Sequence, residues 1–195
     1  MTRAVGEPLI RTRRWTRREY DRLIELGMLH EDEPIELLAG RLVVREPQRT
    51  PHAVATQLAA EALRAAFGAG WMVRVQLPLA LDDESEPEPD VTVVRGAPRD
   101  YLHDHPSAPA LVVEVAHVSL RADRIIKARL YARAGIEEYW IVNLVDRVLE
   151  VYRAPTGRGS GRRAAYADVR RIAPPEFVTP LAAPSGTIAV ADLLP

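Results

Sequence analysis

The segment Leu111–Val115 constrains the fold of this 195-residue chain more than any other segment. It is a nearly continuous apolar run, interrupted only by Glu114. An apolar run of this length is typical of a strand that is buried on both faces, and such strands belong to sheets that carry helices on both sides. The sequence therefore predicts an α/β fold built around this strand.

Helical and strand patterns alternate along the rest of the chain. Helices are predicted over 16–27, 51–67 and 119–134, and strands over 35–38, 41–44, 71–77, 91–94, 111–115, 138–142, 148–152, 165–172 and 187–190. Strands interleaved with helices in this order indicate a mixed β-sheet flanked by helices. We expect a single domain over residues 1–195, because a chain of this length buries roughly 70% of its unfolded surface.

The composition excludes several classes of protein. Apolar residues make up 47% and charged residues 27% of the chain, which are ordinary globular values. No run of about 18 apolar residues is present to span a bilayer. The arginine-rich start, residues 1–18, lacks the apolar stretch of a secretory signal. We therefore expect a soluble, cytoplasmic protein without a membrane partner.

Residue types also restrict metal and phosphate binding. The chain has no cysteine, so any metal must be held by oxygen or imidazole. Its net charge of −1 lacks the basicity of a protein that coats nucleic acid by charge alone. Two arginine clusters could contact phosphates, although solvated surface is the simpler interpretation. They are Arg11, Arg13, Arg14, Arg17 and Arg18, and Arg158, Arg162 and Arg163.

Glu114 is the most informative residue of the sequence. In the period of two that a strand imposes, its side chain shares a face with Val112 and Ala116. Placing an unpaired carboxylate in such surroundings costs several kcal/mol. Metal coordination, a cationic partner and protonation are the three ways to offset that cost.

Lys127 is the only lysine of the chain and lies on the predicted helix that follows Glu114. It stands four residues after Asp123 and four before Tyr131, so the three form one helical stripe, which we expect to face inward. Its ammonium group could then reach the same site as Glu114. The alternative is a structural ion pair of Lys127 with Glu114 or Asp123.

Asp90 places a second carboxylate at the start of the predicted strand 91–94. Two carboxylates with a lysine beside them suit phosphodiester hydrolysis, in which the acids hold Mg²⁺ or Mn²⁺ and the lysine stabilises developing charge. Glu36, on an earlier strand, would be a third acid. Alternatively, Asp90 is a turn or capping residue and Glu36 is a surface residue.

Two weaker candidates are His52 and Asp123. His52 begins the second predicted helix, where it could meet phosphate or metal, although a surface or capping role is the simpler interpretation. The other histidines show no zinc-ligand spacing such as His-Glu-x-x-His. P-loop, dinucleotide-binding and Gly-x-Ser-x-Gly motifs are also missing from the sequence, which excludes those enzyme classes.

The order of these residues resembles the Uma2 (DUF820) family of the PD-(D/E)XK nuclease superfamily. The matching stretches lie within about residues 15–153, which would form the nuclease-like core, and 154–195 would be a strand-and-loop extension. The matching stretches are 35–40, the helix start at His52, Pro89–Val91, Leu111–Val115, the stripe Asp123, Lys127 and Tyr131, and Gly135–Val142.

The resemblance implies a restriction-endonuclease-like core in which Asp90 and Glu114 are metal ligands, Lys127 is the catalytic lysine and Glu36 is a supporting acid. It also implies that the lysine has migrated, because the superfamily's usual lysine position, two residues after the second acid, is Ala116 here. Three further departures from the family pattern are Ala39 and Asn143, where the family usually has Asp, and the segment 116–120.

We therefore expect a metal-dependent endonuclease that cleaves DNA with Mg²⁺ or Mn²⁺, and that could form a homo-oligomer. The first alternative is a non-catalytic nucleic-acid-binding or assembly module that retains the fold, because the modest net charge disfavours a strong grip on phosphates. A glycosidase with a carboxylate pair is a third interpretation, in which Lys127 would have no role.

Overall fold

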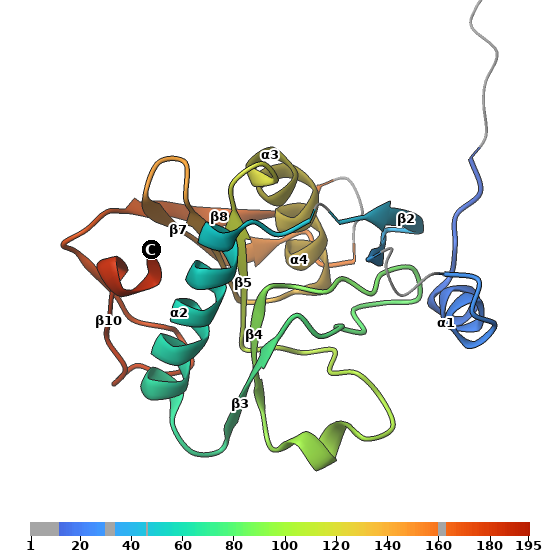
Figure 1. Cartoon of the computed structure of the whole chain (residues 1–195), viewed down its shortest axis with the longest axis horizontal. Coiled ribbons are helices and arrows are strands. Elements are labelled where there is room, and N and C mark those ends of the chain that lie inside the picture. Colours follow the sequence, from blue (N-terminus) through green and yellow to red (C-terminus); the bar gives the residue numbers. More distant parts are fainter. Residues whose placement is uncertain (1–11, 30–33, 46, 160–162) are drawn as a thin grey trace, which may run out of the picture.

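The computed structural model describes residues 12–29, 34–45, 47–159 and 163–195, and its centre is a six-stranded mixed sheet (Figure 1). The strands follow the order β3-β4-β5-β6-β7-β8, in which only β5 and β6 pair in parallel. They are β3 (Trp71–Val75), β4 (Val91–Arg95), β5 (Leu111–Ala116), β6 (Glu138–Asn143), β7 (Val148–Thr156) and β8 (Ala165–Ile172). The predicted mixed sheet is confirmed.

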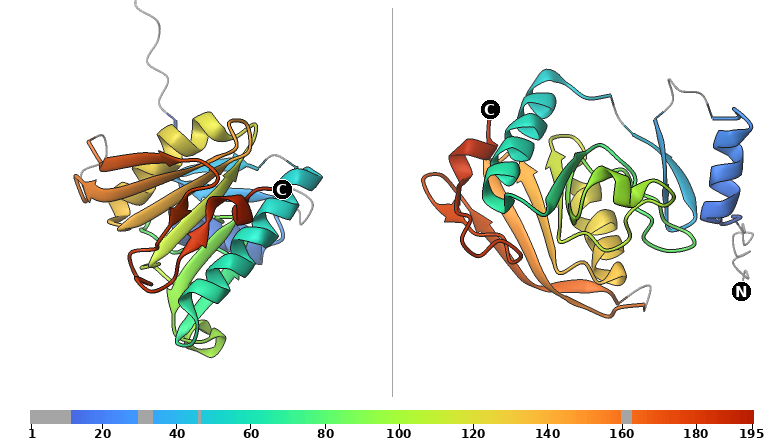
Figure 2. Two further views of the ribbon diagram at one scale, coloured as in Figure 1. Left: turned by 90° about the vertical axis from the view of Figure 1, so that its left-hand side faces the viewer. Right: turned by 90° about the horizontal axis from the view of Figure 1, so that it is seen from below.

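Helices cover both faces of the sheet (Figure 2). On one face lies α2 (Thr50–Phe67), and on the other lie α3 (Leu120–Ala122), the π-helical turn η2 (Asp123–Lys127) and α4 (Ala128–Ala134). All six residues of β5 are buried, and its apolar residues alternate between the two core clusters. The prediction that this strand is buried on both faces, with helices on each side, is confirmed.

A smaller unit carries Glu36 at one end of the molecule (Figure 2). It consists of α1 (Arg17–Glu25) and the hairpin of β1 (Ile35–Leu38) and β2 (Arg41–Val44). Thr16 and Glu19 form the capping box at the start of α1. The bridge between Leu37 and Glu86 ties the hairpin to the acidic loop before β4, so Glu36 is held near the sheet.

The C-terminal residues return to the α2 face of the sheet. They form β9 (Phe177–Val178), β10 (Ile188–Ala189) and the 3-10 helix η3 (Val190–Leu193). A further 3-10 turn, η1 (Pro98–Tyr101), lies earlier in the chain, between β4 and β5. Val178, Ile188 and Leu193 belong to the same core cluster as α2. The segment expected to be an extension therefore contributes both β8 and part of the core.

Several local predictions differ from the structure, and one of them is the strand predicted over 148–152, which extends to Thr156 in β7. The helix predicted over 119–134 contains the π turn η2, because helical periodicity alone does not reveal a one-residue insertion. The strand predicted to reach residue 77 ends at Val75, because Gln76 adopts a positive φ of 51°. The strand predicted over 187–190 is limited to two residues and passes into η3.

None of the helices in the described ranges is both long and apolar enough to cross a membrane.

Candidate active site

Glu114, Lys127 and Glu36 come together from three separate elements. Lys127, the last residue of η2, places its Nζ atom 2.9 Å from Glu114 Oε1 on β5 and 3.5 Å from Glu36 Oε1 on β1. Both glutamates are 3% exposed. The geometry of the structural ion pair considered for Lys127 is thus present, and it stands within a cluster of acids.

The inward stripe predicted for the third helix is confirmed, and the π turn is part of it. Asp123 begins η2, Lys127 ends it, and Tyr131 follows one turn later in α4. Asp123 and Tyr131 are buried, and the Tyr131 hydroxyl donates a hydrogen bond of 2.7 Å to Glu114 Oε1. Two donors, an ammonium group and a phenol, therefore meet the same oxygen of Glu114.

Asp90 is held against β5, the strand that carries Glu114, by a main-chain hydrogen bond. It precedes β4, whose Val91 pairs with Val113, so its side chain lies beside the end of β5. Asp90 Oδ2 accepts a 2.8 Å bond from the main-chain N–H of Val115 and lies 3.2 Å from His52 Nε2. Asp90 Oδ1 accepts a weaker bond from Gln76 at 3.4 Å.

The acids of the site differ in the direction in which their pKa is shifted. Burial raises the pKa of Glu114 to about 8 despite the neighbouring Lys127, and burial raises the pKa of Asp123 to about 6. Burial would also raise the pKa of Asp90, but its hydrogen bonds with His52 and Val115, together with the nearby charges of His52 and Lys127, outweigh burial and the net pKa is lowered. Asp90 is therefore ionised at neutral pH.

The surroundings of Lys127 and His52 favour their charged forms. Burial would lower the pKa of Lys127, but Glu114, Glu36 and Asp123 outweigh it and the net pKa is raised. In the same way burial disfavours the His52 imidazolium, yet the hydrogen bond to Asp90 and the charge of Asp90, with smaller contributions from Val115 and Asp123, raise its pKa overall. Burial raises the pKa of Tyr131 far above its usual value, so this phenol stays protonated and acts as a donor.

The donor set fits a hard divalent cation that keeps part of its water shell. Within the described part of the chain, no three His, Asp or Glu side chains are grouped closely enough to hold a metal by themselves. Mg²⁺ sites in proteins commonly use one or two carboxylates, with water and phosphate oxygens completing the shell. The buried Asp123 Oδ2 has no hydrogen-bond partner. Asp90 and Glu114 can therefore supply two ligands in surroundings with surplus negative charge.

Sequence reasoning missed three residues near the site. Glu88 donates its main-chain N–H to Glu36 Oε2, and its carboxylate pairs with Arg45 at 2.8 Å. Gln76 contacts Asp90 from the residue after β3. Glu88 belongs to the acidic loop that is visible in the sequence. No local pattern, however, indicated that Arg45 would pair with Glu88 or that Gln76 would contact Asp90.

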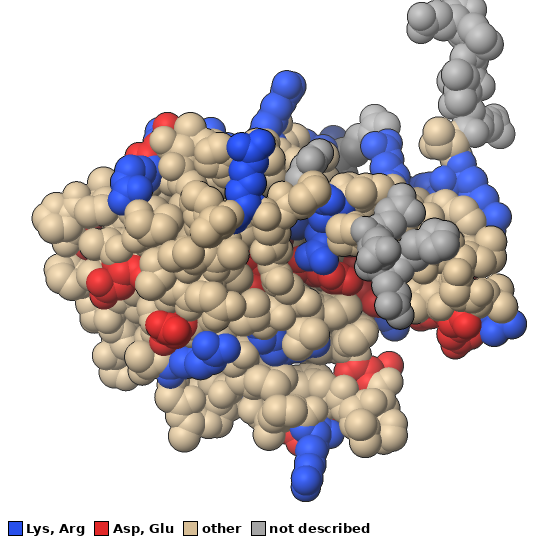
Figure 3. Space-filling view, in the orientation of Figure 1, with Lys and Arg blue, Asp and Glu red and all other residues tan. Residues whose placement is uncertain are grey.

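The predicted arginine clusters are largely engaged with acids. Figure 3 shows basic side chains along the upper part of one face, above the start of α2 and over α3, and an acidic patch between α4 and β2. The ion pairs of the clusters are Arg13–Glu19, Arg14–Glu84, Arg17–Glu86 and Arg158–Glu137. Arg11 and Arg162 lie outside the described residues.

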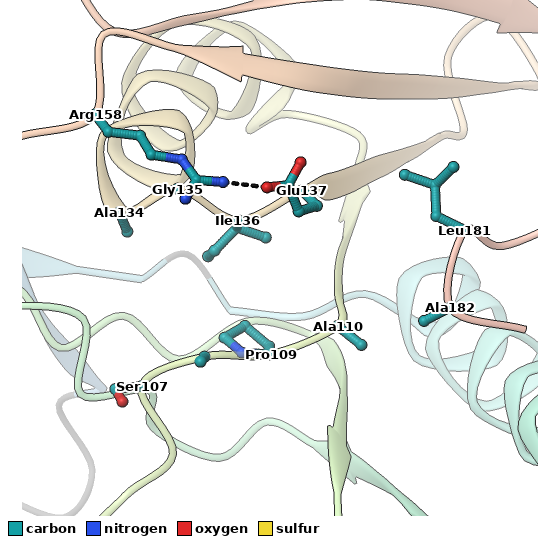
Figure 4. Close-up of a pocket in the computed structure, with 11 residues that line it drawn as sticks. Ser107, Pro109, Ala110, Ala134, Gly135, Ile136, Glu137, Arg158, Leu181 and Ala182 are labelled. Carbon is teal, nitrogen blue, oxygen red and sulfur yellow. Dashed lines mark hydrogen bonds and ion pairs between the residues drawn. The ribbon is translucent and has the colours of Figure 1, made fainter.

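A separate pocket of about 470 Å³ is also present (Figure 4). It is lined by residues at the beginnings of β5 and β6, including Ala110 and Ile136, with Arg158 and Glu137 paired at its edge. Its lining includes none of the buried acids Glu36, Asp90, Glu114 and Asp123. We place the candidate site at Glu114 and Lys127 because buried charged groups with strongly shifted pKa values gather there.

Comparisons with known proteins agree with this fold. The family model of Uma2, described as "Putative restriction endonuclease", matches residues 17–189. None of the curated proteins matches the chain. The crystal structure titled "a putative nuclease belonging to DUF820 from Anabaena variabilis ATCC 29413" is similar, with a TM-score of 0.65 and 16% identity over 88% of this chain and 96% of that chain.

The sheet order and the structural similarity show a restriction-endonuclease-like fold. The family match spans most of the chain, so the chain belongs to the Uma2 family.

Proposed function

We propose that the protein is an endonuclease that hydrolyses phosphodiester bonds in DNA with Mg²⁺ or Mn²⁺. The observation that carries the proposal is the meeting of Glu114 with Lys127, 2.9 Å apart, on the strand whose main chain also binds Asp90. Family membership and fold support a nuclease. Carboxylates with a buried ammonium group are suited to the anionic transition state of phosphodiester cleavage.

In this proposal each residue has a defined task. Asp90 and Glu114 would hold the metal, and the metal would supply positive charge to polarise the phosphate and activate water. Lys127 donates hydrogen bonds to a phosphate oxygen as negative charge develops there, and Glu36 keeps the ammonium group in place. Water attacks phosphorus, and the bond from phosphorus to the leaving sugar oxygen breaks. The attacking water loses a proton to solvent, and the leaving sugar oxygen takes up a proton from solvent.

Cleavage of supercoiled plasmid in Mg²⁺ or Mn²⁺ tests the proposal. We expect the wild-type protein to nick the plasmid, and Glu114→Gln to reduce the rate by about 100-fold or more, because a ligand that helps stabilise the transition state by several kcal/mol is lost. Glu61→Gln, on an exposed position of α2, is the matched control and should cleave like the wild type. Equal cleavage by Glu114→Gln would show that this site is not responsible.

A second candidate function is a nucleic-acid-binding module without catalysis. It is favoured by one observation, that Lys127 and Glu114 already satisfy each other as an ion pair without a metal. This function predicts DNA binding that weakens with salt, no cleavage in either metal, and no effect of Glu114→Gln on binding.

A further inference from the structure

The hydrogen bonds of Glu114 are distributed unequally between its two oxygens. Oε1 receives the ammonium group of Lys127 at 2.9 Å and the hydroxyl of Tyr131 at 2.7 Å. No residue in the described ranges donates a hydrogen bond to Oε2. A carboxylate held in this way presents one satisfied oxygen and one oxygen that is available to a ligand.

Tyr131 is a rigid donor because its ring is locked in the core. The side chain is fully buried in α4, and the ring packs against Tyr139 with a centroid distance of 4.9 Å. Its hydroxyl therefore has little freedom to leave Glu114. The position of the phenol follows from the helix, since Tyr131 lies one turn after Lys127 on the same buried stripe.

Lys127 is a less constant partner for the same oxygen. Its ammonium group is shared between Glu114 at 2.9 Å and Glu36 at 3.5 Å, and 11% of its side chain is exposed. In the proposed reaction this group also reaches a phosphate oxygen. When it does so, Tyr131 is the donor that still fixes the orientation of the Glu114 carboxylate.

We propose that Tyr131 is a positioning residue that occupies Glu114 Oε1 and so leaves Oε2 to bind the metal. This inference rests on the proposed function, because it takes Glu114 to be a metal ligand. Groups that hydrogen-bond a ligating side chain fix its orientation, and their loss typically weakens metal affinity about 10- to 100-fold. Tyr131 touches neither substrate nor metal in this arrangement and acts through Glu114.

Calorimetric titration of the full-length protein with Mn²⁺, in the absence of DNA, tests the inference. We expect Tyr131→Phe, which keeps the ring and removes only the hydroxyl, to bind Mn²⁺ about 10- to 100-fold more weakly than the wild type. The matched control is Tyr166→Phe, since the Tyr166 hydroxyl is also buried and donates to the carbonyl of Ile136 at 2.9 Å. That control loses one comparable hydrogen bond and should keep the wild-type affinity.

The outcomes separate this inference from the function on which it rests. Wild-type Mn²⁺ affinity in Tyr131→Phe overturns the inference and leaves the proposed function in place. Equal weakening by Tyr166→Phe also overturns it, because the effect then belongs to any lost buried hydroxyl. A wild-type protein that takes up no Mn²⁺ overturns the proposed function together with the inference. Thermal unfolding of each variant verifies that the protein titrated is folded.

Discussion

At the scale of single residues, buried acids outnumber the cations that neutralise them. Glu36, Asp90, Glu114 and Asp123 are between 3% and 7% exposed, and Lys127 makes direct ion pairs with two of them. Leaving a charge uncompensated in such surroundings costs several kcal/mol. Lys127 therefore stabilises the folded state in addition to any role in chemistry.

This argument predicts a stability defect for Lys127→Met. Removal of the ammonium group leaves Glu114 and Glu36 without their cation, so we expect the free energy of unfolding to fall by about 3 kcal/mol, measured by urea denaturation. Adding Glu114→Gln should cost less than the sum of the two single changes, because the double variant leaves fewer unpaired charges. Arg129→Met, at an exposed position of α4, is the control and should change stability by less than about 0.5 kcal/mol. Strict additivity would contradict a direct coupling of Lys127 and Glu114.

At the scale of elements, the π turn and the β1–β2 hairpin bring the charges together. The π turn η2 lies between α3 and α4, and π turns within helices often occur at functional sites. It begins at Asp123 and ends at Lys127, so it carries both a buried acid and the ammonium group that pairs with Glu114 and Glu36. The hairpin brings Glu36 to Lys127 from outside the main sheet.

The hairpin turn predicts a stabilising substitution. Ala39 adopts a left-handed φ of 48°, which costs an L-residue such as Ala roughly 1 kcal/mol, whereas Asn adopts this conformation more readily. We expect Ala39→Asn to raise the free energy of unfolding by up to about 1 kcal/mol, measured by urea denaturation. Ala53→Asn, in an ordinary turn of α2, should instead lower it slightly. A loss of stability at position 39 would show that contacts of the turn outweigh its backbone strain.

At the scale of the whole molecule, the chain closes its core with its last residues. The last strands and η3 return to the face of the sheet that α2 covers. Leu193 is 1% exposed there, although it is two residues from the end of the chain. The α2 face therefore depends on residues that follow the stretch 15–153, in which the sequence motifs of the family lie.

A substitution at Leu193 measures this dependence. We expect Leu193→Ala to lower the free energy of unfolding by about 3 kcal/mol, because it removes buried methyl groups and leaves a cavity. Leu181→Ala provides the control, since Leu181 is 51% exposed and should change stability by no more than about 0.5 kcal/mol. Chemical denaturation of both variants gives the comparison, and equal stabilities would mean that the C-terminal residues do not support the core.

Much of the architecture could be predicted because its signals are local. The capping box of Thr16 and Glu19, the turn at Gly40 and the apolar run of β5 each act over a few residues. The candidate acids were also recognisable, because Glu114 interrupts an apolar strand. The π turn and the positive φ of Gln76 were not, since neither leaves a residue pattern of its own.

The sequence by itself determined which residues form the strands and helices, and which charges would lie among apolar side chains. Only the tertiary structure decided that Tyr131 binds Oε1 of Glu114, that His52 lies beside Asp90, and that Arg45 pairs with Glu88. The reason is physical. Periodicity and capping depend on neighbours along the chain, whereas these contacts join residues 17 to 43 positions apart and exist only after the whole sheet and its helices have packed.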